Sequence, residues 1–341
     1  MDKHGAMFLL LGLLFTGAIT LFLYMDALNS AYGLSRGIVL NDPASFYDNS
    51  GRLNIVGVVD NNGEYPVDVT VGVNVTATTD AISTISTNGI SSSDNSMVST
   101  LTSPTFAKVI FPGTGAPFKI VVPPKVIEAV GQPFIYSVIG KERAYYDVLD
   151  LNYSNMAVGS ERALIGTLSN SAPFPVYNAT VFASVHDSNQ AQIDSAITEV
   201  IPMLEPGQKI QFKLSPDKSI KSNAVYYSCA GVDLDAPITT VPTSDGGFIP
   251  FDLQAIAKII DLKYDDQSKS LVFGVDHYNP EGGFITLKLP QVHDNQELTI
   301  VMDGLPRKDV KMTHDGKTIK MDIFIPPDEH QIQVKGVSHV T

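Results

Sequence analysis

The chain has 341 residues and a formal net charge of −13, with 36 Asp and Glu against 23 Lys and Arg. Phosphate recognition needs clustered basic side chains, and no such cluster occurs, so the composition argues against a nucleic-acid partner. Trp is absent and long helix-favouring stretches are missing, which predicts an all-β fold. Cys229 is the only cysteine, so an internal disulfide is excluded; a buried thiol is expected, with an intermolecular bridge as the alternative.

An uncharged apolar segment, residues 5–25, stands near the start of the chain. About 20 apolar residues span the core of a bilayer. Lys3 and His4 precede the segment and Asp26 follows it, a weak bias that places the short N-terminus in the cytoplasm. We expect an uncleaved signal anchor over 1–26, with a single pass through the cell membrane and the bulk of the chain extracytoplasmic. A cleaved signal peptide is the alternative, although Asn29-Ser30-Ala31 is a poor cleavage site.

The segment after the anchor is polar and shows no regular alternation of apolar and polar residues. We interpret residues 27–51 as a spacer that leaves room for a first strand. Residues 53–59 then read as a strand, and in 67–75 valine alternates with polar or small residues, which predicts a strand with one buried and one solvated face.

A Ser/Thr-rich stretch follows: sixteen of the thirty residues in 76–105 are Ser or Thr, and none is Lys or Arg. Such a stretch buries little apolar surface, which favours a mobile or glycan-bearing insertion. A polar hairpin at a sheet edge is an equally weighted alternative.

The first predicted β unit, which begins at residue 53, recurs at an offset of 109 residues in its first half. Ile55-Val56-Gly57 matches Leu164-Ile165-Gly166, Asn61 matches Asn170, and Tyr65-Pro66-Val67 matches Phe174-Pro175-Val176. Pro112-Gly113 with Phe118 matches Pro206-Gly207 with Phe212 at identical internal spacing but at an offset fifteen residues shorter, because the first copy has fifteen extra residues between Pro66 and Pro112. Repetition of a β unit predicts tandem modules, each with its own core.

The second copy resembles the FxLYD-type immunoglobulin-like domain of exported prokaryotic proteins. The similar features are Gly166, Leu168 and Asn170 in a G-x-L-x-N turn, Pro175-Val176, Val185-His186-Asp187, Leu204-x-Pro206-Gly207 and Phe212. The resemblance covers residues 147–217, and residues 53–123 resemble the same domain more weakly. It implies a small β-sandwich and no catalytic residues.

The C-terminal region shows seven short alternating strands separated by turn sequences, a pattern typical of a sandwich. Residues 264–334 are similar to C-terminal β domains of surface proteins from ammonia-oxidising archaea. The predicted fold class is therefore all-β, with tandem immunoglobulin-like β-sandwich modules behind one N-terminal transmembrane helix. The predicted domains are the signal anchor 1–26, the spacer 27–51, module 1 over 52–146 with its Ser/Thr-rich insertion, module 2 over 147–236, a linker over 237–250 and module 3 over 251–341.

The sequence lacks the short motifs of common catalytic sites. No Gly-rich phosphate loop, G-x-S-x-G elbow, H-E-x-x-H or C-x-x-C pair occurs. We therefore expect no enzyme activity, no catalytic residues and no cofactor. The predicted function is a structural, adhesive or complex-accessory role for a membrane-anchored extracytoplasmic protein with a protein partner at the cell surface. The alternative is an extracytoplasmic binding protein for a metal ion or a small ligand.

The C-terminal histidines are candidates for a metal site. If the seven C-terminal strands alternate up and down, His293, His314 and His339 fall at one end of the sandwich, and three imidazoles can hold Zn²⁺ or Cu²⁺. Solvated turn histidines are the simpler alternative.

Asn74, Asn152 and Asn178 each begin an N-x-Ser/Thr sequence on a polar strand face, so we expect glycans on all three, as in a glycoprotein of the cell surface.

Overall fold

The computed structural model describes residues 35–78, 90–93, 96–122, 127–234, 237–293 and 296–338. β-strands are the only regular elements in this part of the chain, which confirms the all-β prediction. Within the same residues, no helix has the length and apolar character needed to cross a bilayer. The predicted anchor segment, residues 5–25, lies outside the described residues.

The first sheet pair is built from residues 38–140. Sheet 1a has the order β1-β2-β6, with β1 (Ile38–Tyr47), β2 (Leu53–Asn61) and β6 (Gly115–Val122). Sheet 1b has β3 (Val67–Thr78) at its centre, paired with β5 (Ser96–Pro104), β7 (Ile127–Val130) and β8 (Phe134–Gly140), while β4 (Ile90–Ser93) pairs with β5. The predicted spacer thus contains a strand, and the described part of the Ser/Thr-rich stretch adopts the edge-hairpin alternative.

The second sheet pair repeats this plan over residues 149–234. Sheet 2a has the order β10-β11-β15, with β10 (Leu149–Tyr153), β11 (Leu164–Asn170) and β15 (Lys209–Leu214). Sheet 2b has β12 (Val176–His186) at its centre, paired with β13 (Gln192–Ile197), β14 (Ile201–Leu204) and β16 (Tyr226–Leu234). The inward residues Val181, Ala183 and Val185 pack in a core shared with sheet 2a.

The third sheet pair contains all seven predicted C-terminal strands. Sheet 3a has the order β19-β22-β26-β25, with β19 (Asp252–Gln254), β22 (Gly283–Pro290), β26 (Thr318–Ile325) and β25 (Lys311–His314). Sheet 3b has the order β24-β23-β27-β21-β20-β9, with β24 (Leu305–Arg307), β23 (Thr299–Met302), β27 (Glu329–Lys335), β21 (Ser270–His277), β20 (Ala257–Asp265) and β9 (Tyr145–Tyr146). The chain crosses repeatedly between the two sheets, so the simple up-and-down order assumed above is wrong.

The stretch expected to be a linker, 237–250, contains a hairpin of β17 (Thr240–Pro242) and β18 (Phe248–Pro250). Val241 and Ile249 in this hairpin are fully buried in the core of the third sheet pair. Turn residues such as Ser244-Asp245-Gly246-Gly247 indicate a chain reversal, but they do not distinguish a linker from a hairpin whose alternate residues are buried.

The repeat at offset 109 has the same hydrogen-bond network in both copies. The Asn61 Nδ2 donates to the carbonyls of Tyr65 and Ile110 at 2.7 and 2.9 Å, and the Asn170 Nδ2 donates to those of Phe174 and Leu204 at 2.8 and 2.9 Å. Both side chains are buried. Each asparagine joins a turn to a distant segment, because one side-chain amide satisfies backbone groups that would otherwise be buried without partners.

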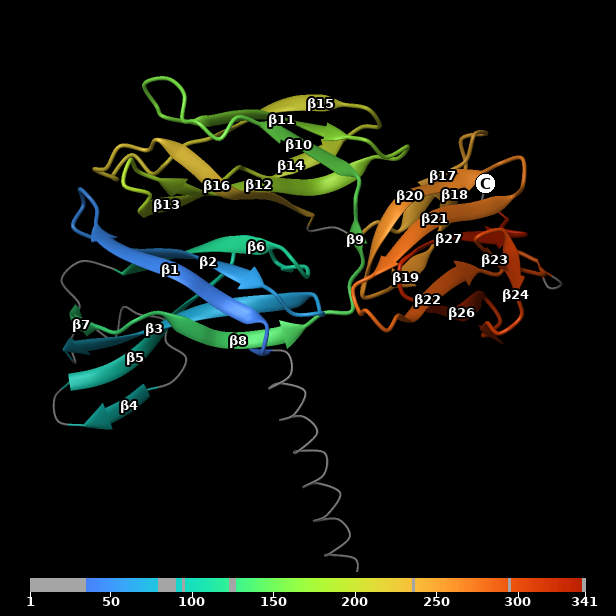
Figure 1. The fold of residues 1–341 in the computed structure, drawn as a ribbon, viewed down its shortest axis with the longest axis horizontal. Coiled ribbons are helices and arrows are strands. Elements are labelled where there is room, and N and C mark those ends of the chain that lie inside the picture. Colours follow the sequence, from blue (N-terminus) through green and yellow to red (C-terminus); the bar gives the residue numbers. More distant parts are fainter. Residues whose placement is uncertain are drawn as a thin grey trace, which may run out of the picture.

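The first two sheet pairs form a stack of four sheet layers, in the order 1b, 1a, 2b, 2a (Figure 1). Strands β2 and β6 of sheet 1a contact β12, β13 and β16 of sheet 2b. Phe182 of sheet 2b packs against the core of the first pair, while its neighbours Val181 and Ala183 face the second core. The third pair lies beside the stack, and β9 passes between them (Figure 1).

Candidate functional site

The three sheet pairs meet at the short strand β9. Tyr145 and Tyr146 follow the last strand of the first pair, yet they pair in parallel with Lys258 and Ile259 at the edge of sheet 3b. The Asp147 N–H donates to the Ile259 carbonyl, and the Asp147 carboxylate pairs with the Lys258 ammonium at 2.7 Å. The segment between the two repeat copies therefore belongs to the sheet of the third pair. Covering an exposed strand edge in this way satisfies its backbone groups.

Aromatic side chains from three parts of the chain pack at the same junction. The ring of Tyr145 lies edge-on to that of Phe111 in the first pair, with 5.0 Å between centroids, and Phe111 also contacts Tyr278 in the third pair at 6.5 Å. Burial, followed by the nearby charge of Asp147, raises the pKa of Tyr145, and burial also raises the pKa of Tyr278. These hydroxyls therefore stay neutral at physiological pH.

A cavity of about 620 Å³ opens at this junction, within the range of small-molecule sites. Its walls come from the loop before β6, the segment leading into β9, strands β10 and β16, the residues after β16 and strand β19. The lining residues are Phe111, Glu142, Arg143, Ala144, Tyr145, Tyr146, Leu149, Leu151, Ala230, Gly231, Val232, Asp233, Leu234, Pro237, Ile238, Thr239, Asp252, Leu253 and Gln254. A site of this kind depends on all three sheet pairs being in place.

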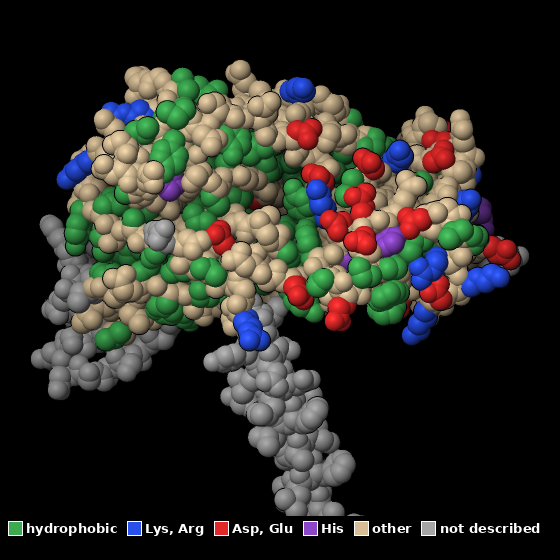
Figure 2. Space-filling model, viewed as in Figure 1, with side chains coloured by type: hydrophobic (Ala, Val, Ile, Leu, Met, Phe, Trp, Pro, Cys, Tyr) green, Lys and Arg blue, Asp and Glu red, His purple; other side chains and the backbone are tan. Residues whose placement is uncertain are grey.

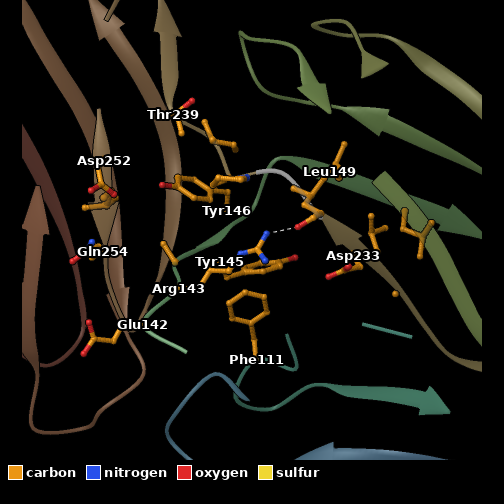
Figure 3. Close-up of a pocket in the computed structure, with 18 of the residues that line it drawn as sticks. Phe111, Glu142, Arg143, Tyr145, Tyr146, Leu149, Asp233, Thr239, Asp252 and Gln254 are labelled. Carbon is orange, nitrogen blue, oxygen red and sulfur yellow. Dashed lines mark hydrogen bonds between the residues drawn. The ribbon is translucent and has the colours of Figure 1, made fainter. Parts of the chain in front are cut away.

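Figure 3 shows Arg143, Tyr145 and Phe111 grouped in the middle of the cavity, with Asp233 and Asp252 on opposite sides. The Arg143 guanidinium donates to the Leu234 carbonyl at the end of β16. Burial, followed by the charge of Asp252, raises the pKa of Tyr146, while Arg143 acts in the opposite direction. Figure 2 shows further Asp and Glu side chains gathered on the near face of the third sheet pair, beside the junction.

A second polar cluster joins the first pair to a loop of the second. The buried Asp48 carboxylate accepts hydrogen bonds from the backbone N–H of Ser50 and Arg52, the Arg52 Nε and, at 3.3 Å, the Ser219 hydroxyl. Burial opposes ionisation of Asp48, but the bonds from Arg52, Asn54 and Ser50 outweigh it and hold the pKa of Asp48 well below its usual range. The cluster is thus an ionised contact that helps to hold the stack together.

His186 contacts two serines on the face of sheet 2b that points away from the core of the second pair. A histidine beside a serine is also the arrangement of a general base and its nucleophile. The His186 Nε2 lies 2.9 Å from Ser184 Oγ and 2.8 Å from Ser228 Oγ. Its Nδ1, however, faces the Gln190 carbonyl, so within the described residues no carboxylate orients the ring. Ser184 is also fully buried and donates to the Ser228 carbonyl. We interpret this group as a structural polar cluster.

Cys229 lies in the same strand as Ser228 and has a left-handed backbone, with φ of 46°. Burial, followed by the charge of Asp60 in the first pair, raises the pKa of the Cys229 thiol to about 12. A thiol with that pKa is almost entirely protonated at physiological pH and is a poor nucleophile.

The structure brings two of the three predicted metal-binding histidines to one end of the third pair. His293 follows β22 and His314 ends β25. Gln291 lies between them: its Oε1 is 3.4 Å from His314 Nδ1, and its Nε2 donates to the His293 carbonyl at 3.3 Å. His339 lies outside the described residues. Within the described residues, no three His, Cys, Asp or Glu side chains are placed to hold a metal ion together. The three-histidine site stays a prediction.

The three predicted glycosylation sites lie in strands β3, β10 and β12, and the side chains of Asn74, Asn152 and Asn178 are all exposed. Asn74 Oδ1 accepts a hydrogen bond from the Thr100 hydroxyl at 2.8 Å, which does not involve the Nδ2 to which a glycan attaches. Access is therefore open at each site, and glycosylation itself stays a prediction.

Sequence reasoning did not find the junction cavity. The sequence feature that best indicates this cavity is Tyr145-Tyr146. These residues lie in the short segment that connects the two repeat copies, where two adjacent large aromatic residues are unusual. Neither periodicity nor motif relates these tyrosines to Lys258 or Asp252, more than 100 residues away in the chain.

A scan against protein-family models finds no match to this chain, and a search of curated proteins finds none either.

Proposed function

We propose that this chain is a membrane-anchored extracytoplasmic protein with a structural, adhesive or complex-accessory role, carried by tandem immunoglobulin-like sandwich modules behind the N-terminal segment. The all-β architecture, the repeated sheet plan and the resemblance of residues 147–217 to FxLYD-type domains support this proposal. We further propose that the role is non-catalytic and that the partner is a protein at the cell surface.

One observation carries the proposal: the sheet pairs are joined into a block rather than strung on free linkers. Lys119 and Asp194 link sheets 1a and 2b, and β9 completes the edge of sheet 3b. A block of this kind holds its outer surfaces at set distances, as a structural or accessory subunit requires. Phe284 and Phe324, paired across β22 and β26 and both exposed on the outer face of sheet 3a, give one of those surfaces apolar character.

The test isolates the membrane fraction of cells that express the tagged full chain. Native electrophoresis after mild crosslinking should place the protein in a larger assembly, and the Phe284→Ser, Phe324→Ser double variant should migrate alone while keeping its melting temperature. Lys311→Ser on the neighbouring strand β25 is the matched control. A native protein that always migrates as a single chain would contradict the proposed role. Extraction with alkaline carbonate tests the anchor, because a protein without one is released from the membrane.

A second candidate function is the binding of a small ligand. The specific observation in its favour is the cavity at the junction, whose volume and mixed aromatic and polar lining suit a small molecule. Filling that cavity by Leu151→Trp should then abolish ligand binding without disrupting the fold.

A further inference from the structure

Among the described residues that line the junction cavity, Arg143 is the one Lys or Arg. A guanidinium has five N–H donors, and the Leu234 carbonyl is its acceptor in the structure. None of the described carboxylates pairs with it. The cavity therefore contains a guanidinium with donors left for a ligand.

Tyr146 lines the same cavity, on the side of Asp252 (Figure 3). Its hydroxyl has no hydrogen-bond partner among the described residues, and burial keeps it in the neutral, donating form. The remaining donors of Arg143 favour a ligand group that only accepts hydrogen bonds. A carboxylate has this property, and a bidentate contact to arginine is among the stronger polar contacts that proteins make.

The acidic residues in the described walls do not offer an equivalent site for a cation. Asp252 is already paired with the Lys288 ammonium at 2.7 Å, and Asp233 is buried and engaged in an interaction of its own. Glu142 is exposed to solvent. A ligand ammonium would have to displace Lys288 or compete with water, whereas a ligand carboxylate meets a guanidinium that pairs with no described carboxylate.

The rest of the cavity suits an apolar body. Aliphatic side chains from three strands and from the segment after β16, Leu149, Val232, Leu253 and Ile238, line it together with the rings of Phe111 and Tyr145. We propose that the junction cavity binds a small carboxylate with an aromatic or aliphatic body, with the carboxylate on Arg143 and the body against these apolar side chains. The inference rests on the proposed ligand-binding function and names its ligand class.

Calorimetry on the full chain in detergent tests the ligand class with three probes of matched shape: 3-phenylpropionate, 3-phenylpropylamine and 3-phenylpropanol. The carboxylate should bind at least tenfold more tightly than the amine or the alcohol. Arg143→Gln should weaken carboxylate binding at least tenfold, and Arg143→Lys should restore part of it. Arg162→Gln removes a positive charge elsewhere and should leave binding unchanged. The melting temperature of each variant reports separately on the loss of the contact with Leu234.

The outcomes separate the ligand class from the ligand-binding function. Amine or alcohol binding that equals carboxylate binding, and that Leu151→Trp abolishes, overturns the ligand class and leaves the cavity as a binding site. Carboxylate binding that Arg143→Gln does not weaken overturns the assigned role of Arg143. If none of the three probes binds at millimolar concentration, both the ligand class and the ligand-binding function are overturned.

Discussion

Lys119 and Asp194 form an ion pair across the contact between the first and second sheet pairs, with 2.7 Å between Lys119 Nζ and Asp194 Oδ1. The two side chains are 14% and 2% exposed. Asp194 also accepts hydrogen bonds from the backbone N–H groups of Ser195 and Asp217, so the carboxylate cannot move to solvent when its partner is removed. A charge left buried without its partner is strongly destabilising.

We therefore expect Lys119→Met to lower the free energy of unfolding by about 3 kcal/mol, measured by urea denaturation. Lys209→Met, at an exposed position of β15, is the control and should change it by less than about 0.5 kcal/mol. Equal midpoints for the two variants would show that the ion pair does not hold the stack together.

The paired asparagines of the repeat predict two matched losses of stability. Asn170→Ala leaves the carbonyls of Phe174 and Leu204 and the N–H of Ala172 without their side-chain partner. These backbone groups are buried and would have neither water nor a protein partner. We therefore expect a loss of about 3 kcal/mol in the free energy of unfolding, and a similar loss for Asn61→Ala. Asn62→Ala, at an exposed position, should be nearly neutral. A neutral Asn170→Ala variant would contradict the structural role of the network.

Two histidines predict opposite slopes of stability with pH. Burial lowers the pKa of His186 despite the opposing effects of Gln190 and Asp187, so the unfolded chain binds this proton at a higher pH than the folded chain does. The stability contribution of His186 is thus present above the ordinary histidine pKa of about 6.5, and it is lost as pH falls through the lowered pKa of the folded state. His186→Gln should flatten the fall in melting temperature between pH 7 and pH 5.

His330 has the opposite effect on how stability changes with pH. Its hydrogen bond to Asp303, 2.6 Å from Nδ1 to Oδ2, raises the pKa of His330 above the unfolded value. That contribution is fully present below about pH 6.5 and is lost as pH rises through the raised value. His330→Gln should consequently lower the melting temperature at pH 5.5 and leave it almost unchanged at pH 8.5. The same shift at both pH values would rule out a titrating pair.

The exposed sequons predict glycans on Asn74, Asn152 and Asn178 when the chain is exported by a host with glycosylation machinery. Glycopeptide mass spectrometry should find all three modified. Thr76→Ala, Ser154→Ala and Thr180→Ala should each remove one glycan. Three bare asparagines in the native protein would contradict the expectation.

The three-histidine hypothesis predicts one Zn²⁺ or Cu²⁺ per chain, with His293, His314 and His339 as ligands. Calorimetry with the metal ion alone should detect binding to the full chain, and it should be lost both in the His293→Ala, His314→Ala double variant and in His339→Ala. His277→Ala, at the opposite end of the third pair, serves as the control. Absence of binding to the unmodified chain would end the hypothesis.

Local patterns in the sequence determined the β class and most of the strands. The alternation from Val67 to Val75 places five valines on one buried face, because successive side chains in a strand point to opposite faces. The offset of 109 located the equivalent turns at Asn61 and Asn170, since the same turn needs the same residues in both copies. These features depend on neighbours a few residues apart, which a sequence displays directly.

Only the tertiary structure decided how the sheets come together. The parallel pairing of Tyr145 with Lys258, the packing of sheet 1a on sheet 2b and the placement of Arg143 in a cavity bring together segments that are distant in the chain. An exposed strand edge accepts any chain with free backbone groups, so no local pattern specifies that β9 is its partner. The candidate site lies where these long-range contacts meet, because each sheet pair contributes only part of its walls.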